Sequence, residues 1–403
     1  MAKIAIMGFG TVGSGVLEVL ETNKISIAEK CSDTITVKYI LDIRDFSEDP
    51  HHELFTKNFE DILNDEEVSV VVETMGGLHP SYDFTKRLLL KGKHVVTSNK
   101  ELVAAYGAEL LQIAREKDIN YMFEASVGGG IPIIRPLNSC LAANEITEIV
   151  GILNGTTNYI LTEMFESGKE FSVALKDAQD KGYAEKNPAA DVEGHDACRK
   201  IAILSSLVFG KRVDYTKINT DGITDITLTD VKYAEAYGSV IKLIGRAKIE
   251  NDRVFASVEP TMLKTSHSLA GIKDVFNGIL VKGNAIGDVM FYGRGAGKLP
   301  TASAVVADVI DCVRNLDRNN HYFWEEVDTD FVVPYDQNTA KFLVRIAGSY
   351  EEQKDRICNL FGETEVLQIK EGEFGIMTSE MTVADLKEKM KQVSAIKKIK
   401  FID

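Results

Sequence analysis

The sequence predicts an α/β protein with a doubly wound parallel sheet, an adjoining α+β domain and a C-terminal β-α-β-β-α-β unit. Over about the first 130 of its 403 residues, short apolar strands alternate with amphipathic helices. This alternation is typical of a parallel sheet covered by helices on both faces. Helices followed by longer strands occupy the middle of the chain, and short strands and helices alternate again at its C-terminal end.

A glycine-rich turn lies between the first strand and the first helix. Residues 3–7 form a short apolar strand, and Gly8, Gly10 and Gly13 follow in a GxGxxG pattern. In this context the first glycine permits the tight turn, the second lets a pyrophosphate approach the backbone, and the third lets helix and strand pack closely. The turn predicts a Rossmann-type cofactor site at residues Gly8, Gly10, Thr11, Val12 and Gly13.

The dinucleotide-binding domain is predicted to span residues 1–130. Its further strands are expected at residues 35–41, 68–73, 94–97 and 120–123, and its helices at residues 59–63, 82–91 and 102–117. A glycine-rich turn that includes Gly297 and the helical pattern after it are expected to complete this domain with about residues 293–318.

Two further domains are expected. The α+β domain, residues 131–292, should carry helices on one face of a sheet. Its helices are expected at residues 134–141, 172–180, 194–208 and 229–244, with another opening at 154–158, and its strands at 146–153, 246–249, 254–262, 278–284 and 287–292. The C-terminal unit, residues 337–403, has the split βαβ order, with strands at 341–347, 364–370, 374–379 and 396–402 and helices at 351–361 and 383–392.

Composition favours a soluble, cytoplasmic protein that acts on small molecules. No apolar run approaches the roughly 20 residues that a membrane-spanning helix needs, and the first residues enter a strand without a basic, apolar leader. Five widely spaced cysteines without a CxxC pair suit reduced thiols rather than disulfides or zinc. A formal net charge of −15 disfavours nucleic acid as a partner.

The most informative polar residues are Asp196 and Lys200, which stand four apart on a predicted helix. A pair at this spacing is usually a solvated surface pair worth a few tenths of a kcal/mol, and spacing alone leaves that alternative open. Residues 201–209 are apolar nearly all round, as in a buried helix, so the charges that open it indicate a polar pocket. Glu185, in a preceding turn, is expected to join them.

These residue types suit hydride transfer to a carbonyl. The reaction needs a cofactor, a proton source for the developing alkoxide, and groups that fix the rest of the substrate. A protonated lysine stabilises the negative charge and supplies the proton. The carboxylates of Glu185 and Asp196 suggest a substrate that bears an ammonium group.

Cofactor preference depends on the end of the second strand. An acidic side chain there, Asp42 or Asp45, would accept hydrogen bonds from a ribose 2′-hydroxyl, whereas Arg44 would pair with a 2′-phosphate. Both residue types are present, so the residues leave NAD and NADP open.

Two turns after later strands are expected near the nicotinamide, because ligands of open α/β sheets lie outside the carboxyl ends of the strands. One turn is residues 73–77 and the other contains Ser98 and Lys100. Lys100 is a candidate acid, although a surface lysine at the start of a helix is an equally good interpretation of the pattern.

The segment from Glu124 to Ile131 combines a carboxylate with a glycine-rich backbone. Carboxylate and main-chain carbonyl oxygens are ligands for hard cations, so a monovalent or alkaline-earth ion is one possibility. A hinge between domains explains the same glycines more simply. His195 lies beside Asp196 but on a different helix face, so we expect a structural role for it.

Seven ordered segments resemble the homoserine dehydrogenase family and cover about residues 3–310. The most specific is the GYAE to DVEGHDACRK block. The segments are GFGTVGSGV, ETMGG, HVVTSNKELVA, EASVGGGIPII, GILNGTTNYIL, GYAEKNPAADVEGHDACRKIAIL and GRGAGKLPTASAVVADV.

The resemblance implies interconversion of L-aspartate 4-semialdehyde and L-homoserine with NADPH or NADH, on the route to threonine, methionine and isoleucine. It implies that Lys200 donates the proton and that Lys100 is a second catalytic lysine. Residues similar to those that bind homoserine are Glu185, Asp196, Asp191 and Thr156, and residues similar to those near the cofactor are Ser98, Lys100, Gly182, Glu185 and Gly297.

The resemblance also favours NADP and a sodium ion. Arg44 matches the place where family members meet the 2′-phosphate. Glu124, with the backbone carbonyls of Val127, Gly129 and Ile131, is similar to the sodium site of the family. Members are usually homodimers or homotetramers, and the same state is expected here.

The C-terminal unit resembles an ACT regulatory domain. Its loop at residues 347–352 lacks the Asp-x-Pro-Gly run usual in such domains, so binding of threonine or another effector does not follow. A role in dimerisation or docking is the alternative.

Two other functions are alternatives to the dehydrogenase. A phosphorylating semialdehyde dehydrogenase needs a nucleophilic cysteine, whereas Cys140 lies late in an apolar helix pattern and Cys198 in a buried one, so both are expected to be inert. A nucleotide-sensing regulatory protein would not need Glu185, Asp196 and both lysines together.

Overall fold

The computed structural model describes residues 1–320, 322–327 and 331–403. The chain divides into two units. The first unit comprises Met1–Glu145, Ala202–Asp214 and Gly293–Asp328, and the second comprises Ile146–Ile201, Tyr215–Tyr292 and Thr329–Asp403. Among the described residues, no helix has the length and apolar character needed to cross a membrane.

The first unit contains a sheet of six parallel strands in the order β3-β2-β1-β4-β5-β6. The strands are β1 (Ala2–Met7), β2 (Ile35–Leu41), β3 (Phe55–Thr56), β4 (Val68–Glu73), β5 (His94–Thr97) and β6 (Tyr121–Met122). This is the order of a dinucleotide-binding sheet, whose ligand crevice lies where the order reverses, between β1 and β4. The predicted doubly wound sheet is confirmed.

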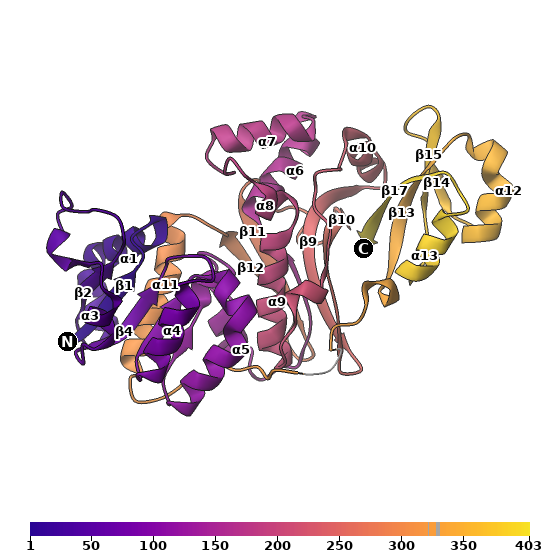
Figure 1. The fold of residues 1–403 in the computed structure, drawn as a ribbon. Coiled ribbons are helices and arrows are strands. Elements are labelled where there is room, and N and C mark those ends of the chain that lie inside the picture. Colours follow the sequence, from indigo (N-terminus) through magenta and orange to yellow (C-terminus); the bar gives the residue numbers. More distant parts are fainter. Residues whose placement is uncertain (321, 328–330) are drawn as a thin grey trace. The chain divides into compact units, whose positions relative to one another are not determined.

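Helices pack on this sheet in pairs (Figure 1): α1 contacts α11, and α4 contacts α5. The helices of the unit are α1 (Thr11–Thr22), α2 (Lys24–Cys31), α3 (Phe59–Leu63), α4 (Ser81–Leu90), α5 (Lys100–Glu116) and α11 (Lys298–Arg314). The segment that was expected to return to this sheet therefore does so through α11, which also contacts β4 and β5.

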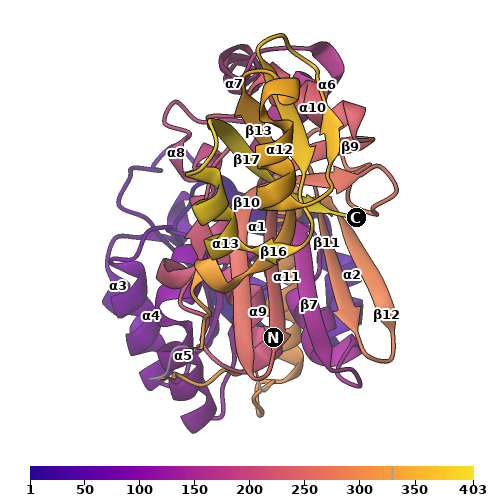
Figure 2. The ribbon, with the colours of Figure 1, turned by 90° about the vertical axis from the view of Figure 1, so that its right-hand side faces the viewer.

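The second unit contains a mixed sheet in the order β12-β11-β7-β9-β10-β17-β13-β15-β14. Its first five strands lie side by side in Figure 2. Elements before the C-terminal part are β7 (Ile146–Ile152), α6 (Gly155–Ser167), α7 (Phe171–Asp180), α8 (Ala189–Val192), α9 (His195–Phe209), β8 (Asn219–Thr220), α10 (Leu228–Ala236), β9 (Ser239–Glu250), β10 (Arg253–Lys264), β11 (Phe276–Gly283) and β12 (Gly287–Arg294).

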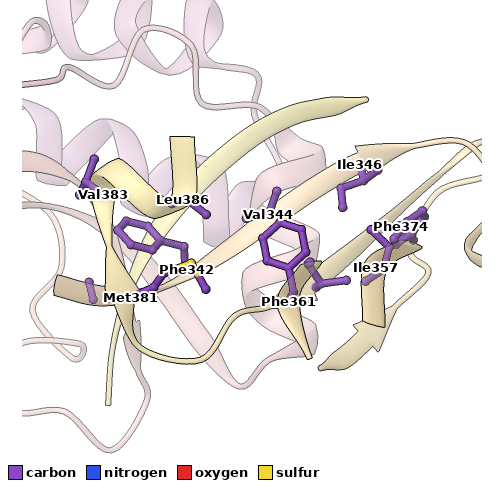
Figure 3. Close-up of a cluster of buried hydrophobic side chains, with 11 residues drawn as sticks. Phe342, Val344, Ile346, Ile357, Phe361, Phe374, Met381, Val383 and Leu386 are labelled. Carbon is purple, nitrogen blue, oxygen red and sulfur yellow. The ribbon is translucent and has the colours of Figure 1, made fainter. Parts of the chain in front are cut away.

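The C-terminal part has the expected β-α-β-β-α-β order, with one further two-residue strand, β16, before its last helix, and joins this sheet. Its β17 pairs in parallel with β10 and antiparallel with β13. Two helices share one face of the strands, where apolar side chains including Phe342, Ile357 and Phe374 form a buried cluster (Figure 3). The elements are β13 (Thr339–Ala347), α12 (Tyr350–Phe361), β14 (Glu365–Leu367), β15 (Glu373–Met377), β16 (Met381–Thr382), α13 (Val383–Met390) and β17 (Ala395–Ile402).

The prediction of one helix over residues 229–244 is wrong. The helix α10 ends at Ala236, and Gly238 follows with a φ of +61°, a left-handed conformation that stops the helix. Residues 240–244, which are apolar except for Lys242, instead belong to β9, which pairs with β10 over its whole length. An apolar run of this length does not distinguish a buried strand from a helix, so the sequence pattern did not show where the helix ends and the strand begins.

The helix expected at residues 134–141 forms, but only its first two residues are α-helical. Ile134 and Arg135 are α-helical, and a π-helical turn, η3 (Pro136–Cys140), continues from them. Pro136 has no N–H to donate, and the N–H groups of Ile133, Ile134 and Arg135, which open the helix, donate to the carboxylate of Glu124. A side chain from an earlier turn therefore caps this helix.

Candidate active site

The predicted pair Asp196 and Lys200 lies on α9 in the second unit and is buried. Lys200 Nζ is 2.8 Å from Asp196 Oδ2, and the two side chains are only 9% and 5% exposed. Lys200 Nζ also donates to the carbonyl oxygen of Leu153 at 2.9 Å. The surface-pair alternative is therefore wrong, and a buried ammonium is held at the carboxyl end of β7 by two oxygen acceptors.

Asn154 links this pair to a second carboxylate. Its side-chain NH₂ group donates to Asp196 Oδ2 at 2.9 Å and to Asp191 Oδ1 at 2.7 Å. Its side-chain oxygen accepts from the N–H of Thr157 at 2.9 Å and so caps α6. One buried amide thus fixes the helix and spaces two carboxylates that would otherwise repel each other. We refer to Asn154, Asp191, Asp196 and Lys200 as the carboxylate–lysine cluster.

Asn154 is not among the site residues predicted from the sequence. The signal that could have identified it is an asparagine directly after a strand and before a Gly-Thr-Thr helix start, which is a strong N-cap pattern. A cap uses only the oxygen of the amide, so both N–H donors remain for other groups.

Thr156 lies next to this cluster at the start of α6. It is buried, and its hydroxyl donates to the carbonyl oxygen of Tyr183 at 2.7 Å. This bond fastens the turn that holds Gly182, whose φ of +74° explains the glycine there, to α6. Glu185, two residues beyond Tyr183, is exposed, and its backbone carbonyl accepts from Gln179.

His195 takes no part in the cluster. It lies 3.2 Å from Glu193, and both side chains are 54% exposed. This agrees with the expectation that it points to a different face of α9. Among the described residues, no group of three histidine, cysteine or acidic side chains is arranged to hold a metal ion.

The glycine-rich turn follows β1 in the first unit and matches its predicted geometry. Gly8 has a φ of +91°. A Cβ on Gly13 would lie 1.9 Å from the Gly8 carbonyl oxygen, so only glycine lets the helix start this close to the strand. At Gly10 a Cβ would meet nothing within 4 Å, which leaves this face of the turn open. Thr11 and Val12 begin α1 immediately after it.

Asp42 and Arg44 follow β2 and pair with each other. The Arg44 guanidinium donates to both Asp42 oxygens, at 3.0 and 2.8 Å, and the Phe9 N–H of the glycine-rich turn donates to Asp42 Oδ2 at 2.8 Å. These bonds, chiefly that from Arg44, hold the pKa of Asp42 below its usual range. Arg44 is 56% exposed, whereas the Asp42 side chain is only 7% exposed.

Ser98 and Lys100 follow β5, where a buried carboxylate organises the turn. Glu73 accepts from the Thr97 hydroxyl at 2.6 Å and from the Met75 N–H at 2.8 Å, and its burial raises its pKa. Lys100 is the first residue of α5 and is partly buried. The turns after β4 and β5 are thus joined by side-chain bonds at the carboxyl edge of the sheet.

Glu124 is buried in the first unit and binds a backbone turn. Its carboxylate accepts from the N–H groups of Ile133, Ile134 and Arg135 at 2.6, 2.8 and 2.8 Å. Its own N–H donates to Asp308 at 2.8 Å, and Arg135 bonds the same Asp308 at 2.5 Å. Burial, together with the charge of Glu124, raises the pKa of Asp308 to about 7.

Gly129 and its neighbours pack against the glycine-rich turn before α11. Gly129 has a φ of +57°, and a Cβ there would lie 2.3 Å from the Gly295 carbonyl oxygen. Within the described part of the chain, no backbone N–H donates to the carbonyl oxygen of Val127, Gly129 or Ile131. Gly297, at a φ of +125°, is the N-cap of α11.

Cys198 and Cys140, the two cysteines considered as nucleophiles, differ in exposure. Cys198 is 4% exposed within α9, as expected. Cys140 is exposed at the end of the η3 turn, so the inertness expected of it would not come from burial.

Comparison with known proteins decides the family. Residues 8–124 match the model for the homoserine dehydrogenase NAD-binding domain, and residues 132–310 match the homoserine dehydrogenase model. The chain is 38% identical over 348 residues to the homoserine dehydrogenase of Bacillus subtilis, covering 85% of this chain and 80% of that protein. It is 44% identical over 321 residues to that of Synechocystis sp., covering 77% of this chain and 73% of that protein.

The chain belongs to the homoserine dehydrogenase family.

Solved structures of homoserine dehydrogenases are similar to this chain. A homoserine dehydrogenase from Thiobacillus denitrificans superposes with a TM-score of 0.93 at 34% identity and covers 100% of this chain and 98% of that chain. A hyperthermophilic archaeal homoserine dehydrogenase in complex with NADPH has a TM-score of 0.66 at 27% identity and covers 77% of this chain and 97% of that chain.

Membership in the homoserine dehydrogenase family confirms the resemblance stated from the sequence. The chain is therefore an NAD(P)-dependent oxidoreductase, and residues 8–124 form its nicotinamide dinucleotide domain. The rival functions, a phosphorylating dehydrogenase and a nucleotide sensor, are not supported by any of these matches.

Proposed function

We propose that the carboxylate–lysine cluster is where this chain interconverts L-aspartate 4-semialdehyde and L-homoserine. The observation that supports the proposal is the buried Asp196–Lys200 pair, linked through Asn154 to Asp191. Buried charged groups cost free energy unless they are paired, so a cluster of this kind is typical of a functional site. This activity would place the chain in threonine, methionine and isoleucine synthesis.

Lys200 is the proposed proton donor. An ammonium group has three hydrogens, and two are taken by Asp196 and the Leu153 carbonyl. The third is available to the carbonyl oxygen of the semialdehyde. As that oxygen gains negative charge, the ammonium stabilises it and transfers its proton, which yields the hydroxyl of homoserine. A bound nicotinamide dinucleotide supplies the hydride to the carbonyl carbon.

The carboxylates have a different proposed role, which is to hold the substrate ammonium. Asp196 and Asp191 lie on either side of the Asn154 amide. Glu185 is exposed and is proposed to reach both substrate and cofactor, with Gly182 beside the cofactor. Thr156 shapes the pocket through its bond to Tyr183. Lys100, on the first unit, is proposed as the second catalytic lysine.

NADP is the proposed cofactor rather than NAD. The Asp42 carboxylate is already engaged by Arg44 and by the Phe9 N–H, so it is a poor partner for a ribose hydroxyl. Arg44 is exposed and can turn its guanidinium to a 2′-phosphate. Arg44→Leu should raise the KM for NADPH at least about tenfold and change that for NADH little. Equal effects on both cofactors would contradict the proposal.

A sodium ion is proposed between Glu124 and the carbonyl oxygens of Val127, Gly129 and Ile131. These oxygens suit a hard cation, and the three carbonyls lack backbone donors among the described residues. Two buried carboxylates, Glu124 and Asp308, lie there, and of the two only Asp308 bonds the Arg135 guanidinium among the described residues, so a cation would balance the excess charge. The ion would order the turn. Raising NaCl at constant ionic strength, with choline chloride as the balance, should raise the melting temperature.

A homodimer or homotetramer is also proposed, with the C-terminal ACT-like part, residues 337–403, as a dimerisation or docking unit. Light scattering on the protein as it elutes from a size-exclusion column would measure the mass of the assembly. The mass of a monomer would contradict this proposal. A cytoplasmic location stays a prediction from the sequence.

The decisive assay for the proposed reaction is NADP-dependent oxidation of L-homoserine by the folded protein. We expect turnover without added phosphate. Absence of turnover in well-folded protein would overturn the proposal, and phosphate-dependent acylation would favour the phosphorylating alternative. Repeating the initial rates with NADH and with threonine tests cofactor preference and feedback.

A further inference from the structure

A second buried lysine, Lys242 on β9, lies outside every site described above. It is 4% exposed. Its Nζ donates to Asn158 Oδ1 at 2.9 Å and to the Ile272 carbonyl oxygen at 2.6 Å, and both acceptors are neutral. Among the described residues, no carboxylate forms an ion pair with it. Buried lysines are normally paired with an anion, so this ammonium lacks the usual partner.

Its own donors fix the orientation of the Asn158 amide that accepts from Lys242. The side-chain NH₂ group of Asn158 donates to the carbonyl oxygens of Ile272, Asp274 and Phe276 at 3.3, 3.0 and 3.0 Å. Its oxygen is therefore fixed toward Lys242. Because an ammonium carries three hydrogens, one stays without a protein acceptor in the described part of the chain.

Lys242 borders a cavity of about 240 Å³ in the second unit. The inner wall comes from α6, β9 and the loop before β11 and combines apolar residues with one hydroxyl, that of Thr162. The apolar wall residues are Leu161, Phe165, Val240, Ile241 and Ala270. Pockets for drug-sized ligands are about 300–1,000 Å³, so this cavity suits a smaller molecule with a short aliphatic body.

The rim of the cavity is polar and exposed. Lys273 pairs with Glu166 there, so their charges offset each other. Glu235, on α10, is exposed and adds a carboxylate to the rim. A ligand that carried an ammonium group at its outer end would meet this negative charge.

Burial lowers the pKa of Lys242 to about 8, with Glu166, Lys273 and Asp274 as the nearest charged groups. The lysine is therefore mostly charged near neutral pH. A buried charge with only neutral acceptors gains most from an anion that enters its cavity.

We infer that this cavity binds a small carboxylate with a short aliphatic body, whose carboxylate pairs with the Lys242 ammonium and whose body contacts the walls that Leu161 and Val240 provide. Two sources share this chemistry: a plain aliphatic acid, and an aliphatic α-amino acid, whose ammonium group stands next to its carboxylate. The site does not depend on the proposed reaction, because none of its residues belongs to the carboxylate–lysine cluster.

Calorimetric titration of the full chain with isobutyrate, L-valine and isobutyramide tests this inference. Isobutyrate or L-valine should bind saturably, and the neutral amide should bind at least about tenfold more weakly because it lacks the charge. Tighter binding of L-valine would identify the amino acid as the source, and tighter binding of isobutyrate the plain acid. Absence of saturable binding by both, or equal binding of the amide, would overturn the inference.

Substitution of single lysines tests whether the ligand binds at Lys242. Lys242→Met should weaken binding of the better ligand at least about tenfold, whereas Lys273→Met, which removes a rim lysine, should change it less than about threefold. Unchanged binding by folded Lys242→Met would overturn the inference.

If that variant does not fold, chemical labelling of lysines in the wild-type protein tests the inference instead. Lysines are acetylated with and without the ligand, and the modified peptides are quantified by mass spectrometry. Selective protection of Lys242 supports the site, and an unchanged rate at Lys242 in the presence of saturating ligand overturns it.

Discussion

Two aspartate–lysine pairs with the same spacing lie on two helices of the second unit and have opposite environments. Lys176 and Asp180 on α7 are 65% and 60% exposed, whereas Asp196 and Lys200 on α9 are 5% and 9% exposed. Helical spacing brings the charges together in both cases. Only the pair on α9 has additional buried partners, Asn154 and the Leu153 carbonyl.

The difference shows that burial, not spacing, separates a surface pair from a site. Solvent screens the charges of the pair on α7, so their attraction is weak. On α9 each charge depends on the other, because removing one would leave the other unpaired in a buried environment.

Lys242 provides a third case in the same unit. It is as buried as Lys200 and also bonds a backbone carbonyl, but its second acceptor is the amide of Asn158 rather than a carboxylate. Lys176 is therefore exposed and paired, Lys200 is buried and paired, and Lys242 is buried with neutral acceptors only.

The largest expected effect follows removal of the buried ammonium on α9. Lys200→Met should lower kcat for homoserine oxidation about 10³-fold or more, because it removes the proposed acid, and leave cofactor affinity near normal. Steady-state kinetics and cofactor titration would measure both. Lys176→Met is the matched control and should keep full activity. If Lys200→Met retained most of its turnover, the acid would have to be Lys100 or water.

The next effect concerns the pH dependence of stability. The folded pKa of Lys242, about 8, lies below its usual value of 10.5. Below about pH 8 the lysine is charged in both states, and its burial cost is fully present. Between pH 8 and 10.5 the folded state gives up the proton while the unfolded state retains it, so stability rises.

Wild type should therefore gain free energy of unfolding relative to Lys242→Met across that pH range, on the order of 3 kcal/mol. Urea unfolding at several pH values would measure the difference between the two proteins. A difference that stays constant from pH 7.5 to 10.5 would show that Lys242 is not perturbed by burial. Lys176→Met serves again as the exposed reference.

A smaller effect is expected for the amide that links the two carboxylates. Asn154→Asp keeps an oxygen that can cap α6 but replaces the NH₂ donor with a third negative charge beside Asp191 and Asp196. We expect kcat/KM for homoserine to fall about 10- to 30-fold, which is about 1.4–2 kcal/mol. Circular dichroism should show an unchanged fold. A loss of helix content with unchanged kinetics would assign Asn154 to capping alone.

The smallest effect is expected at the exposed pair. Asp180→Asn should change the free energy of unfolding by less than about 0.5 kcal/mol and leave turnover unchanged. Chemical denaturation would check the value. A loss above about 1 kcal/mol would mean that exposure does not distinguish the two pairs as proposed.

The sequence alone predicted the local features of this protein. The GxGxxG turn, the parallel first sheet, the C-terminal element order and the neighbouring positions of Asp196 and Lys200 follow from short-range spacing. Such spacing is fixed by the geometry of turns, strands and helices, so it is readable before the chain is folded. The ordered motifs also identified the family, which the comparisons confirm.

Tertiary structure decided what those local features do. Leu153, which accepts from Lys200, is 47 residues away in sequence, and the carboxylate of Glu124 caps a helix that begins ten residues after it. Long-range packing also made residues 240–244 a strand and, among the described residues, left Lys242 without a carboxylate partner. Burial and pairing depend on which segments meet in the folded chain, and no local pattern contains that information.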